Sequence, residues 1–497
     1  MDIARDKGVN LAVVFLFLLN FVMGLAFVNE GLFHYDSVVL AQAVEKTFHT
    51  GTLQPAVRGR YGSVISSFLV SLPFLISGLY SDFVINLSSI LFHSLSVAVL
   101  FLLVSELFND KRQAFYCAVL FSFTPFYFIP NTYGKEHGAS IFFLILSFFV
   151  LYKGVNKKSS FLIVLSTLLF VFTITIRESA LVTVPLFFLL FFRPTVRVRP
   201  FKVSFYSNSL DVKSLVSFIL PLAVVFSLIF FVYFKHTIYN ALFVNNTGST
   251  FFLGLFSDNF FNALHALRKS VPLLIFILSV WGMFRMIVEH KLFLAVFLFF
   301  WFLLIFCIAN TDTFVPRYLD IIIIPVYMSA TYMLSKLYIK NRIIISAVVA
   351  YLVISMFVFM YPLLNTRKNY NGEKRFALFV KEKTENDSII IVLDDAPFIS
   401  YYAKRNVMAN DINGYGKIDA FIGKVKECLR NEIPVYIVES ALISYFSEYF
   451  NNALFGNFTV TSVGSSLWED YHSAEAHFRF RYLRLFKIEL KHEPNLV

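Results

Sequence analysis

Long apolar stretches separated by short polar ones run along the sequence from Val9 to Tyr361, and beyond Tyr361 they stop. A helix needs about 20 mostly apolar residues to cross the hydrocarbon core of a bilayer. The pattern therefore predicts a polytopic α-helical membrane protein with about eleven spans. The predicted spans cover residues 9–28, 83–104, 114–130, 139–152, 161–176, 179–192, 214–234, 271–288, 292–309, 318–334 and 343–361.

The apolar segment Ser63–Leu79 is shorter than most of these spans and contains Pro73. If it lies along the interface or re-enters, the basic segments 111–112, 153–158 and 193–202 all share the side of the N-terminus. If it crosses, all three move to the opposite side. Because Lys and Arg concentrate in cytoplasmic loops, we predict that Ser63–Leu79 does not cross and that the last span ends outside.

The sequence changes character from Asn371 onward, where helical and strand-like patterns alternate. This alternation predicts a C-terminal soluble α/β domain, so that the two domains are residues 1–365 and 366–497. In the last strand, aromatic residues at 478, 480 and 482 alternate with arginines and are expected on the buried face. The predicted helices are 373–383, 397–404, 416–430 and 441–450, and the predicted strands are 388–393, 435–438, 458–463 and 478–488.

The composition agrees with a membrane protein, because 58% of the residues are hydrophobic and the mean hydropathy is +0.69. The net charge of +11 comes from Lys and Arg in short loops between apolar stretches, so it does not indicate nucleic-acid binding. Cys117, Cys307 and Cys428 are too few and too scattered for a disulfide framework or a cysteine metal site. The first span lacks a small-residue cleavage site, so we expect a retained helix and a multi-pass protein of the plasma membrane.

The predicted topology brings three polar clusters to the outer face, and the first is 29–62. It places Asp36 just beyond the first span, before a short predicted helix and a basic stretch containing Arg58 and Arg60. A carboxylate there can accept a proton from a substrate. The alternative is that Asp36 only caps the helix beginning near Ser37.

The second cluster is Lys135-Glu136-His137, directly before the predicted span 139–152. Lys or His can bind phosphate, and Glu136 with His137 can hold a divalent ion. The alternative is ordinary interfacial charge, since a Glu suits the positive end of a helix dipole.

The third cluster is Arg317-Tyr318, followed by Asp320 at the start of a late span. A guanidinium matches phosphate oxygens with two hydrogen bonds, although Arg317 can also simply reach the membrane interface from the span. Arg177-Glu178 is interpreted as a self-neutralising pair at a tight turn. The single histidines His93, His236 and His265 receive no role.

The order of these clusters resembles the GT-C membrane glycosyltransferases, closest to the protein O-mannosyltransferases and aminoarabinose transferases. In those families an acidic residue beyond the first span is the catalytic carboxylate, commonly in an Asp-Glu pair; here Asp36 is followed by Ser37. An acidic residue at the position of Glu136 and an Arg-Tyr or Arg-Phe pair at the position of Arg317 also recur there.

The resemblance implies an inverting transferase that moves a sugar from a polyprenyl-phosphate donor to a protein, lipid or glycan acceptor at the outer face. Its site residues would be Asp36 for catalysis and, for phosphate or substrate, Arg58, Arg60, Lys135, Glu136, His137, Arg317 and Tyr318. The resemblance implies no definite cofactor, and a divalent metal at Glu136 and His137 stays open. The soluble domain would assist acceptor binding.

Two other classes remain open. A transporter or lipid flippase would carry ionisable residues near the middle of its spans, in broken helices, whereas most charges here lie at span ends. A non-catalytic assembly subunit would use the soluble domain as a binding module. Sugar transfer by the purified protein would separate the three.

Overall fold

The computed structural model describes residues 2–33, 35–52, 68–69, 78–79, 81–192, 195–199, 202–206, 212–229, 258–304, 319–338, 341–392, 396–409, 415–442, 447–470 and 479–491. The chain forms two compact units. The helical unit contains Met1–Val28 and Ala43–Thr366, and the sheet unit contains Asn29–Gln42, Arg367–Ser473 and His477–Val497. The segment Asn29–Gln42 thus groups with the C-terminal residues, although the sequence placed it in the first domain.

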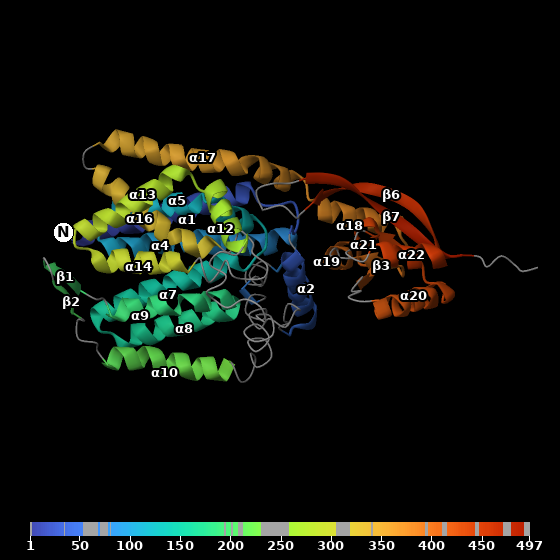
Figure 1. Ribbon diagram of the computed structural model, residues 1–497, viewed down its shortest axis with the longest axis horizontal. Helices are drawn as coiled ribbons and strands as arrows, with labels where there is room; N and C mark the ends of the chain where they lie inside the picture. The colour runs from blue at the N-terminus through green and yellow to red at the C-terminus, as the bar shows by residue number, and fades with distance from the viewer. Residues whose placement is uncertain are drawn as a thin grey trace, which may run out of the picture. The chain divides into compact units, whose positions relative to one another are not determined.

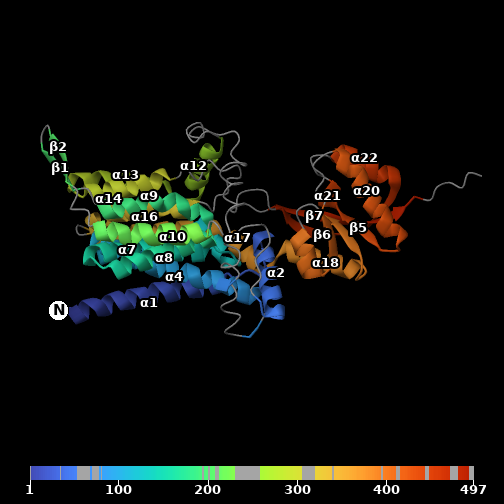
Figure 2. The same ribbon diagram turned by 90° about the horizontal axis from the view of Figure 1, so that it is seen from below.

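The helical unit is a bundle whose long helices lie side by side in both views (Figures 1 and 2). The apolar stretches of the sequence account for these helices, and each predicted span overlaps at least one of them. The elements in chain order are α1 (Asp2–Ala26), α2 (Tyr35–Thr50), α4 (Asp82–Phe108), α5 (Lys111–Ser122), α6 (Pro125–Phe128), η1 (Ile129–Thr132), α7 (His137–Lys157), α8 (Ser160–Ile176), η2 (Glu178–Thr183), α9 (Val184–Phe192), β1 (Thr195–Arg199), β2 (Lys202–Tyr206), α10 (Val212–Ile229), α12 (Asp258–Ser270), α13 (Leu273–Val288), α14 (Leu292–Leu303), α16 (Asp320–Tyr338) and α17 (Arg342–Asn369).

Five helical segments of the described chain are long and apolar enough to cross a membrane, or up to seven if each bent helix pair is one span. One such pair bends by 68° between α5 and α6. Pro125 explains this break, because proline lacks a backbone N–H and disfavours a helical residue before it. Four shorter apolar helices occupy further predicted positions. How many helices cross is still a prediction, and Ser63–Leu79 lies almost wholly outside the described residues.

Helices α4 and α16 form the centre of the bundle, since most of their apolar windows are buried. The contact between α13 and α16 is close because a Cβ on Gly282 would lie only 1.9 Å from the Ser329 carbonyl oxygen. The Ser279 and Ser329 hydroxyls also hydrogen-bond across this contact at 2.5 Å. The basic segment after α9 contains the antiparallel pair β1 and β2, which the sequence did not predict.

The sheet unit contains a five-stranded mixed sheet with strand order β4-β3-β5-β7-β6. Strand β3 runs parallel to β4 and β5, whereas β7 runs antiparallel to β5 and β6. Besides Asn29–Gln42, the elements are α18 (Gly372–Lys383), β3 (Ile389–Val392), α19 (Ala396–Phe398), η7 (Ile399–Ala403), β4 (Asn406–Ala409), α20 (Tyr415–Arg430), β5 (Val435–Val438), α21 (Glu439–Leu442), α22 (Ser447–Asn457), β6 (Phe458–Asp470) and β7 (Arg479–Leu490).

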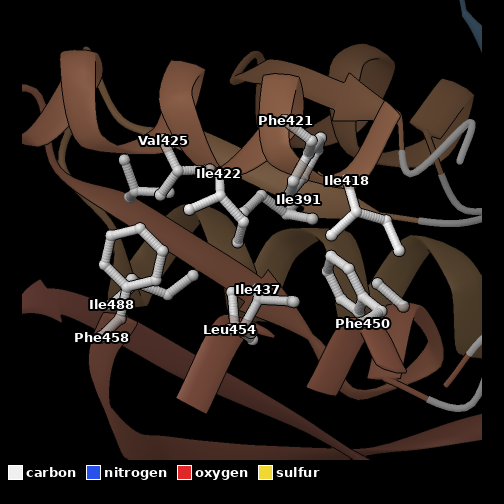
Figure 3. Close-up of a cluster of buried hydrophobic side chains, with 12 residues drawn as sticks. Ile391, Ile418, Phe421, Ile422, Val425, Ile437, Phe450, Leu454, Phe458 and Ile488 are labelled. Atoms are coloured by element: carbon white, nitrogen blue, oxygen red, sulfur yellow. The ribbon is translucent and has the colours of Figure 1, made fainter. Parts of the chain in front are cut away.

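The sheet is buried on both faces, because successive side chains of a strand point to opposite sides. On one face Ile391 and Ile437 pack with α20 and α22 (Figure 3). On the other face their neighbours Ile390 and Tyr436 pack with α18 and η7. This two-sided burial explains why β3 and β5 are continuous apolar runs in the sequence.

Three details of this unit differ from the sequence-based prediction. Strand β4 was not predicted, and the helix expected at 441–450 is instead α21, which ends at Leu442, and α22, which begins at Ser447. In β7 the buried face carries Leu483 and Leu485, while Tyr482 is 69% exposed. The pairing of β7 with β5 sets this face, so the aromatic alternation before residue 483 indicated the wrong side.

Candidate functional site

Polar side chains on one face of α4 hold the loop before α7. Asn86 Oδ1 accepts a hydrogen bond from the Gly134 N–H at 2.6 Å. Ser89 Oγ accepts from the Lys135 N–H and donates to the Lys135 carbonyl, each at 2.6 Å. Asn86 and Ser89 are three residues apart and therefore face the same side of the helix. The main chain beside the second predicted cluster is thus fixed by α4.

Three charged or titratable side chains meet at one end of the helical unit. They come from the start of α7 (His137), the residue after α8 (Arg177) and the start of α16 (Asp320). His137 Nδ1 lies 3.1 Å from Asp320 Oδ2, and Arg177 Nη1 lies 3.9 Å from the same oxygen. The side chains of His137 and Asp320 are each 3% exposed and that of Arg177 is 12% exposed. We call these three residues the buried charge cluster.

The imidazole ring of His137 contacts both of the other groups. Its Nδ1 is within hydrogen-bond distance of Asp320 Oδ2. Arg177 Nη1 lies within hydrogen-bond distance of both ring nitrogens, Nδ1 and Nε2. The other oxygen of Asp320 accepts a hydrogen bond from the Ile321 N–H at 2.8 Å. This N–H lies in the first turn of α16, where main-chain donors have no partner within the helix. The carboxylate of Asp320 therefore contacts both the His137 ring and the Arg177 guanidinium, and the three side chains hold one another in position.

Lys135 and Glu136 continue the same segment. Lys135 is 2% exposed, which is rare for a lysine because an ammonium group is seldom buried unless it is paired. Glu136 is half-buried and occupies the N-cap position of α7, where its side chain forms no capping hydrogen bond. Lys135 and Arg177 together provide two cations at this end of the bundle, which suits an anionic oxygen or phosphate.

Asp36 lies in the sheet unit, in the first turn of α2, with a half-buried side chain. The helix begins at Tyr35, so Asp36 is inside the first turn and not at the predicted cap. Ser37, the second residue of the pair, is fully buried. The other predicted site residues, Arg58, Arg60, Arg317 and Tyr318, lie outside the described residues.

The side chains around Glu136 and His137 bear on the divalent ion predicted for these two residues. Within the described part of the chain, no three side chains of His, Cys, Asp or Glu lie together as metal ligands would. His137 faces Asp320, and the cation in contact with both is the guanidinium of Arg177. A divalent ion bound by Glu136 and His137 therefore receives no support from this geometry.

A second charged group lies at the other end of α16. Glu289, between α13 and α14, contacts Lys336 and Arg285 at 2.8 Å each and also accepts a hydrogen bond from Tyr332. Partial burial alone would raise the pKa of Glu289, but the hydrogen bonds from Lys336, Tyr332 and Arg285 lower it to about 2. Lys336 and Asp320 are 16 residues apart, about 24 Å along a helix.

Sequence reasoning underestimated two residues of the buried charge cluster. Arg177 was paired with Glu178, whose side chain lies outside the described residues, whereas its contacts with His137 and Asp320 come from distant helices. Asp320 was noted beside Arg317 without a role. The available signal was that each is a charged residue at the end of an apolar stretch, where membrane proteins place functional ionisable groups.

Comparison with known structures agrees with this architecture. ArnT from Cupriavidus metallidurans in the apo state aligns with a TM-score of 0.60 at 12% identity, over 97% of this chain and 98% of that chain. The same enzyme bound to undecaprenyl phosphate gives a TM-score of 0.57 at 11% identity over the same shares of the two chains. The Archaeoglobus fulgidus oligosaccharyltransferase in complex with zinc and sulfate gives 0.57 at 12% identity, over 94% of this chain and 72% of that one. The chain has the GT-C fold.

A family model described as dolichyl-phosphate-mannose-protein mannosyltransferase matches residues 63–219, which is less than half of the chain. No curated protein matches the sequence. The predicted resemblance to GT-C membrane glycosyltransferases is thereby confirmed, as is the multi-pass membrane character that accompanies the GT-C fold. The matched region includes α4, α7 and α8. His137 is the first residue of α7, Lys135 lies in the loop directly before it, and Arg177 directly follows α8.

Proposed function

We propose that the protein is an inverting glycosyltransferase that transfers a sugar from a polyprenyl-phosphate donor to an acceptor at the outer face of the membrane. The observation that carries this proposal is the buried charge cluster beside Lys135, at one end of a GT-C bundle. The family model over 63–219 and the polyprenyl-phosphate complex of ArnT support a lipid-linked donor. The acceptor is a protein, lipid or glycan.

The charge distribution along α16 supports the outer location of this end. The opposite end of α16 carries Lys336, close to Arg285 and to Lys291, the residue before α14. Lys and Arg concentrate on the cytoplasmic side of membrane proteins. We therefore propose that the end that carries Asp320 is non-cytoplasmic, and that the sheet unit is on the same side of the membrane, as the predicted topology of about eleven spans requires.

In the proposed reaction, Asp36 accepts the proton of the acceptor hydroxyl or amine as that atom attacks the anomeric carbon. The new glycosidic bond forms while the bond from the anomeric carbon to the phosphate oxygen breaks. The electron pair leaves with the polyprenyl phosphate, and a single displacement inverts the anomeric centre. Asp36 is suited to this role because it is half-buried on a helix, not on a free loop.

The departing phosphate needs positive charge that is already in place. We assign this charge to Lys135 and Arg177, and His137 contacts the Arg177 guanidinium and holds it in place. Asp320 holds the ring of His137 and keeps the local charge balanced, so that the site is stable without substrate. Arg58, Arg60, Arg317 and Tyr318 are proposed to complete the phosphate site, and Glu136 to contact the donor.

Transfer by the purified protein tests the proposal. Detergent-solubilised protein is mixed with a radiolabelled polyprenyl-phosphate sugar and an acceptor preparation, and the anomeric configuration of the product is determined. We expect a product of inverted configuration, and we expect Asp36→Asn to abolish turnover while folding normally. The matched control is Asp82→Asn, because Asp82 is also a half-buried acid in the first turn of a helix, α4. Normal turnover by Asp36→Asn would refute the role of Asp36 as the base.

One observation favours the transporter class as a second candidate. His93 lies well inside α4, is 1% exposed, and forms no hydrogen bond within the described residues through either ring nitrogen. Its ring packs against Tyr127, which belongs to the bent helix pair. Buried ionisable residues beside broken helices are typical of transport pathways. A protein of this class would move a lipid-linked sugar across the membrane of vesicles and would transfer no sugar to an acceptor in detergent.

A further inference from the structure

The segment that carries Asp36 is held by residues more than three hundred positions later in the sequence. Asn29–Gln42 belongs to the sheet unit, together with the end of α17 and with α18 and η7. Asp36 lies in the middle of this segment, four residues after Leu32 and six before Gln42. Its position relative to the rest of the sheet unit therefore depends on the contacts on either side of it.

Both main-chain groups of Glu30 are bound by C-terminal residues. Its N–H donates to the carbonyl of Arg367 at 3.2 Å, and its carbonyl accepts from Lys374 Nζ at 3.2 Å. Its side chain adds two more contacts, since Oε2 accepts from the N–H of Asn371 at 3.1 Å and lies 3.4 Å from Arg375 Nη2. One residue of the segment is thus fixed at four points.

Both main-chain groups of Leu32 are bound in the same way. Its N–H donates to the Tyr402 hydroxyl at 2.9 Å, and its carbonyl accepts from Asn371 Nδ2 at 3.1 Å. Leu32 is completely buried, so these two groups cannot exchange their partners for water without opening the contact. The next residue, Phe33, lies under the Arg367 guanidinium at 3.4 Å from the ring centroid.

Gly31, between these two residues, leaves room for this arrangement. A Cβ at this position would lie 2.8 Å from Lys374 Cδ and 3.1 Å from the Tyr402 hydroxyl. Beyond Asp36, Gln42 Nε2 donates to Ser400 Oγ at 2.7 Å, so the helix is also tied to η7 on its later turns. The contacts before and after Asp36 therefore lead to one part of the sheet unit.

We infer that the sheet unit positions the catalytic carboxylate: Tyr402 and Asn371 hold the backbone of Leu32 and thereby set where Asp36 is presented to the acceptor. This inference rests on the proposed function. Tyr402 and Asn371 are positioning residues, since they act through the main chain. The consequence is that the sheet unit contributes to the chemical step itself, in addition to the acceptor binding expected of it.

The test uses full-length Tyr402→Phe, which removes one hydroxyl and keeps the ring. The matched control is Tyr370→Phe, because the Tyr370 hydroxyl also makes a hydrogen bond of 2.9 Å to the main chain, at Leu467 in the same unit. We expect Tyr402→Phe to lower kcat about tenfold with an unchanged KM for the lipid donor, because a misplaced catalytic group slows the chemical step. Hydrogen exchange of peptides covering residues 29–36 should accelerate in this variant and stay unchanged in the control.

A second variant guards against an uninformative loss of folding. Asn371 Oδ1 caps α18 by accepting from the Lys374 N–H at 2.8 Å, while Nδ2 donates to Leu32. Asn371→Asp keeps the capping oxygen but replaces the donor to Leu32 with a negatively charged acceptor oxygen, so it should reproduce the lower kcat and the faster exchange.

Three results would overturn the inference. Wild-type kcat in both Tyr402→Phe and Asn371→Asp, with Asp36→Asn inactive, would refute positioning and leave the proposed function intact. An equal loss of kcat in Tyr370→Phe would show a general effect on the sheet unit and no specific one. Full turnover by Asp36→Asn would instead refute the proposed base, and the inference with it.

Discussion

The buried charge cluster makes a quantitative prediction about stability. The perturbations are Asp320→Asn and Arg177→Gln, made singly and together. Asp320 Oδ2 and Arg177 Nη1 are 3.9 Å apart, with side-chain exposures of 3% and 12%. Asp320→Asn keeps the size of the side chain and removes its charge, whereas Arg177→Gln removes the charge and also shortens the side chain. The double-mutant cycle is therefore used to isolate the interaction between the two residues.

Two unit charges at this separation attract by about 4 kcal/mol at an effective dielectric constant of 20. Part of this energy is offset by the cost of removing both groups from water. Each single substitution is therefore expected to lower the free energy of unfolding by about 2 to 4 kcal/mol. Because both remove the same interaction, the double variant should lose about 1 to 3 kcal/mol less than the sum of the two.

A reversible denaturant titration of purified protein in detergent micelles, followed by tryptophan fluorescence, gives these free energies. The control cycle is Glu106→Gln with Lys153→Gln, an ion pair of 3.1 Å in the same unit whose side chains are 42% and 35% exposed. Exposed pairs contribute about 0 to 1 kcal/mol. If the Asp320 and Arg177 cycle shows coupling as small as this control, the electrostatic account of the cluster is wrong.

Three further predictions concern other parts of the helical unit. Glu289→Gln should destabilise the protein at neutral pH, because the ionised carboxylate forms a stabilising ion pair with Lys336. The difference in stability from wild type should shrink as the pH falls from 4.5 through about 2, since the carboxyl, whose pKa is lowered to about 2, is then protonated. A difference in unfolding temperature that does not depend on pH would contradict this. Gly282→Ala should lower the unfolding temperature by several degrees, because its Cβ would collide with the Ser329 carbonyl, and an unchanged midpoint would show that α13 can shift freely. Gly138→Ala should lower sugar-transfer activity, because its Cβ would lie 2.5 Å from Asn131 Oδ1 and would displace the loop before α7. Full activity would show that this loop is not rigid.

Local patterns predicted most elements of this protein because they depend on neighbouring residues. The span over residues 83–104 corresponds to α4, and Val435–Val438 is a strand at the predicted bounds. An apolar stretch of 20 residues has few alternatives to a membrane helix, and a short β-branched run between helices has few alternatives to a buried strand. The predicted resemblance to the GT-C glycosyltransferases rested on the order of the polar clusters between such elements, and the structural comparisons show the fold.

Elements that depend on pairing with a distant strand were less predictable. Strand β4 has no strong apolar pattern and exists because β3 offers it an edge. In β7 the buried side is set by its register with β5, so the exposed Tyr482 was placed on the wrong face. Period-two patterns name two faces, and only the partner strand decides which one is buried.

The sequence by itself determined which residue types were available for chemistry: Asp36, Lys135 and His137 were all identified from polar clusters at the ends of apolar stretches. The tertiary structure decided their partners. It brought His137 to Asp320 and Arg177 across three helices, and it joined the segment carrying Asp36 to Tyr402 and Asn371. These contacts connect residues 40 to 370 positions apart. No local pattern encodes them, because they form only when the packing of apolar faces brings distant helix ends and loops together.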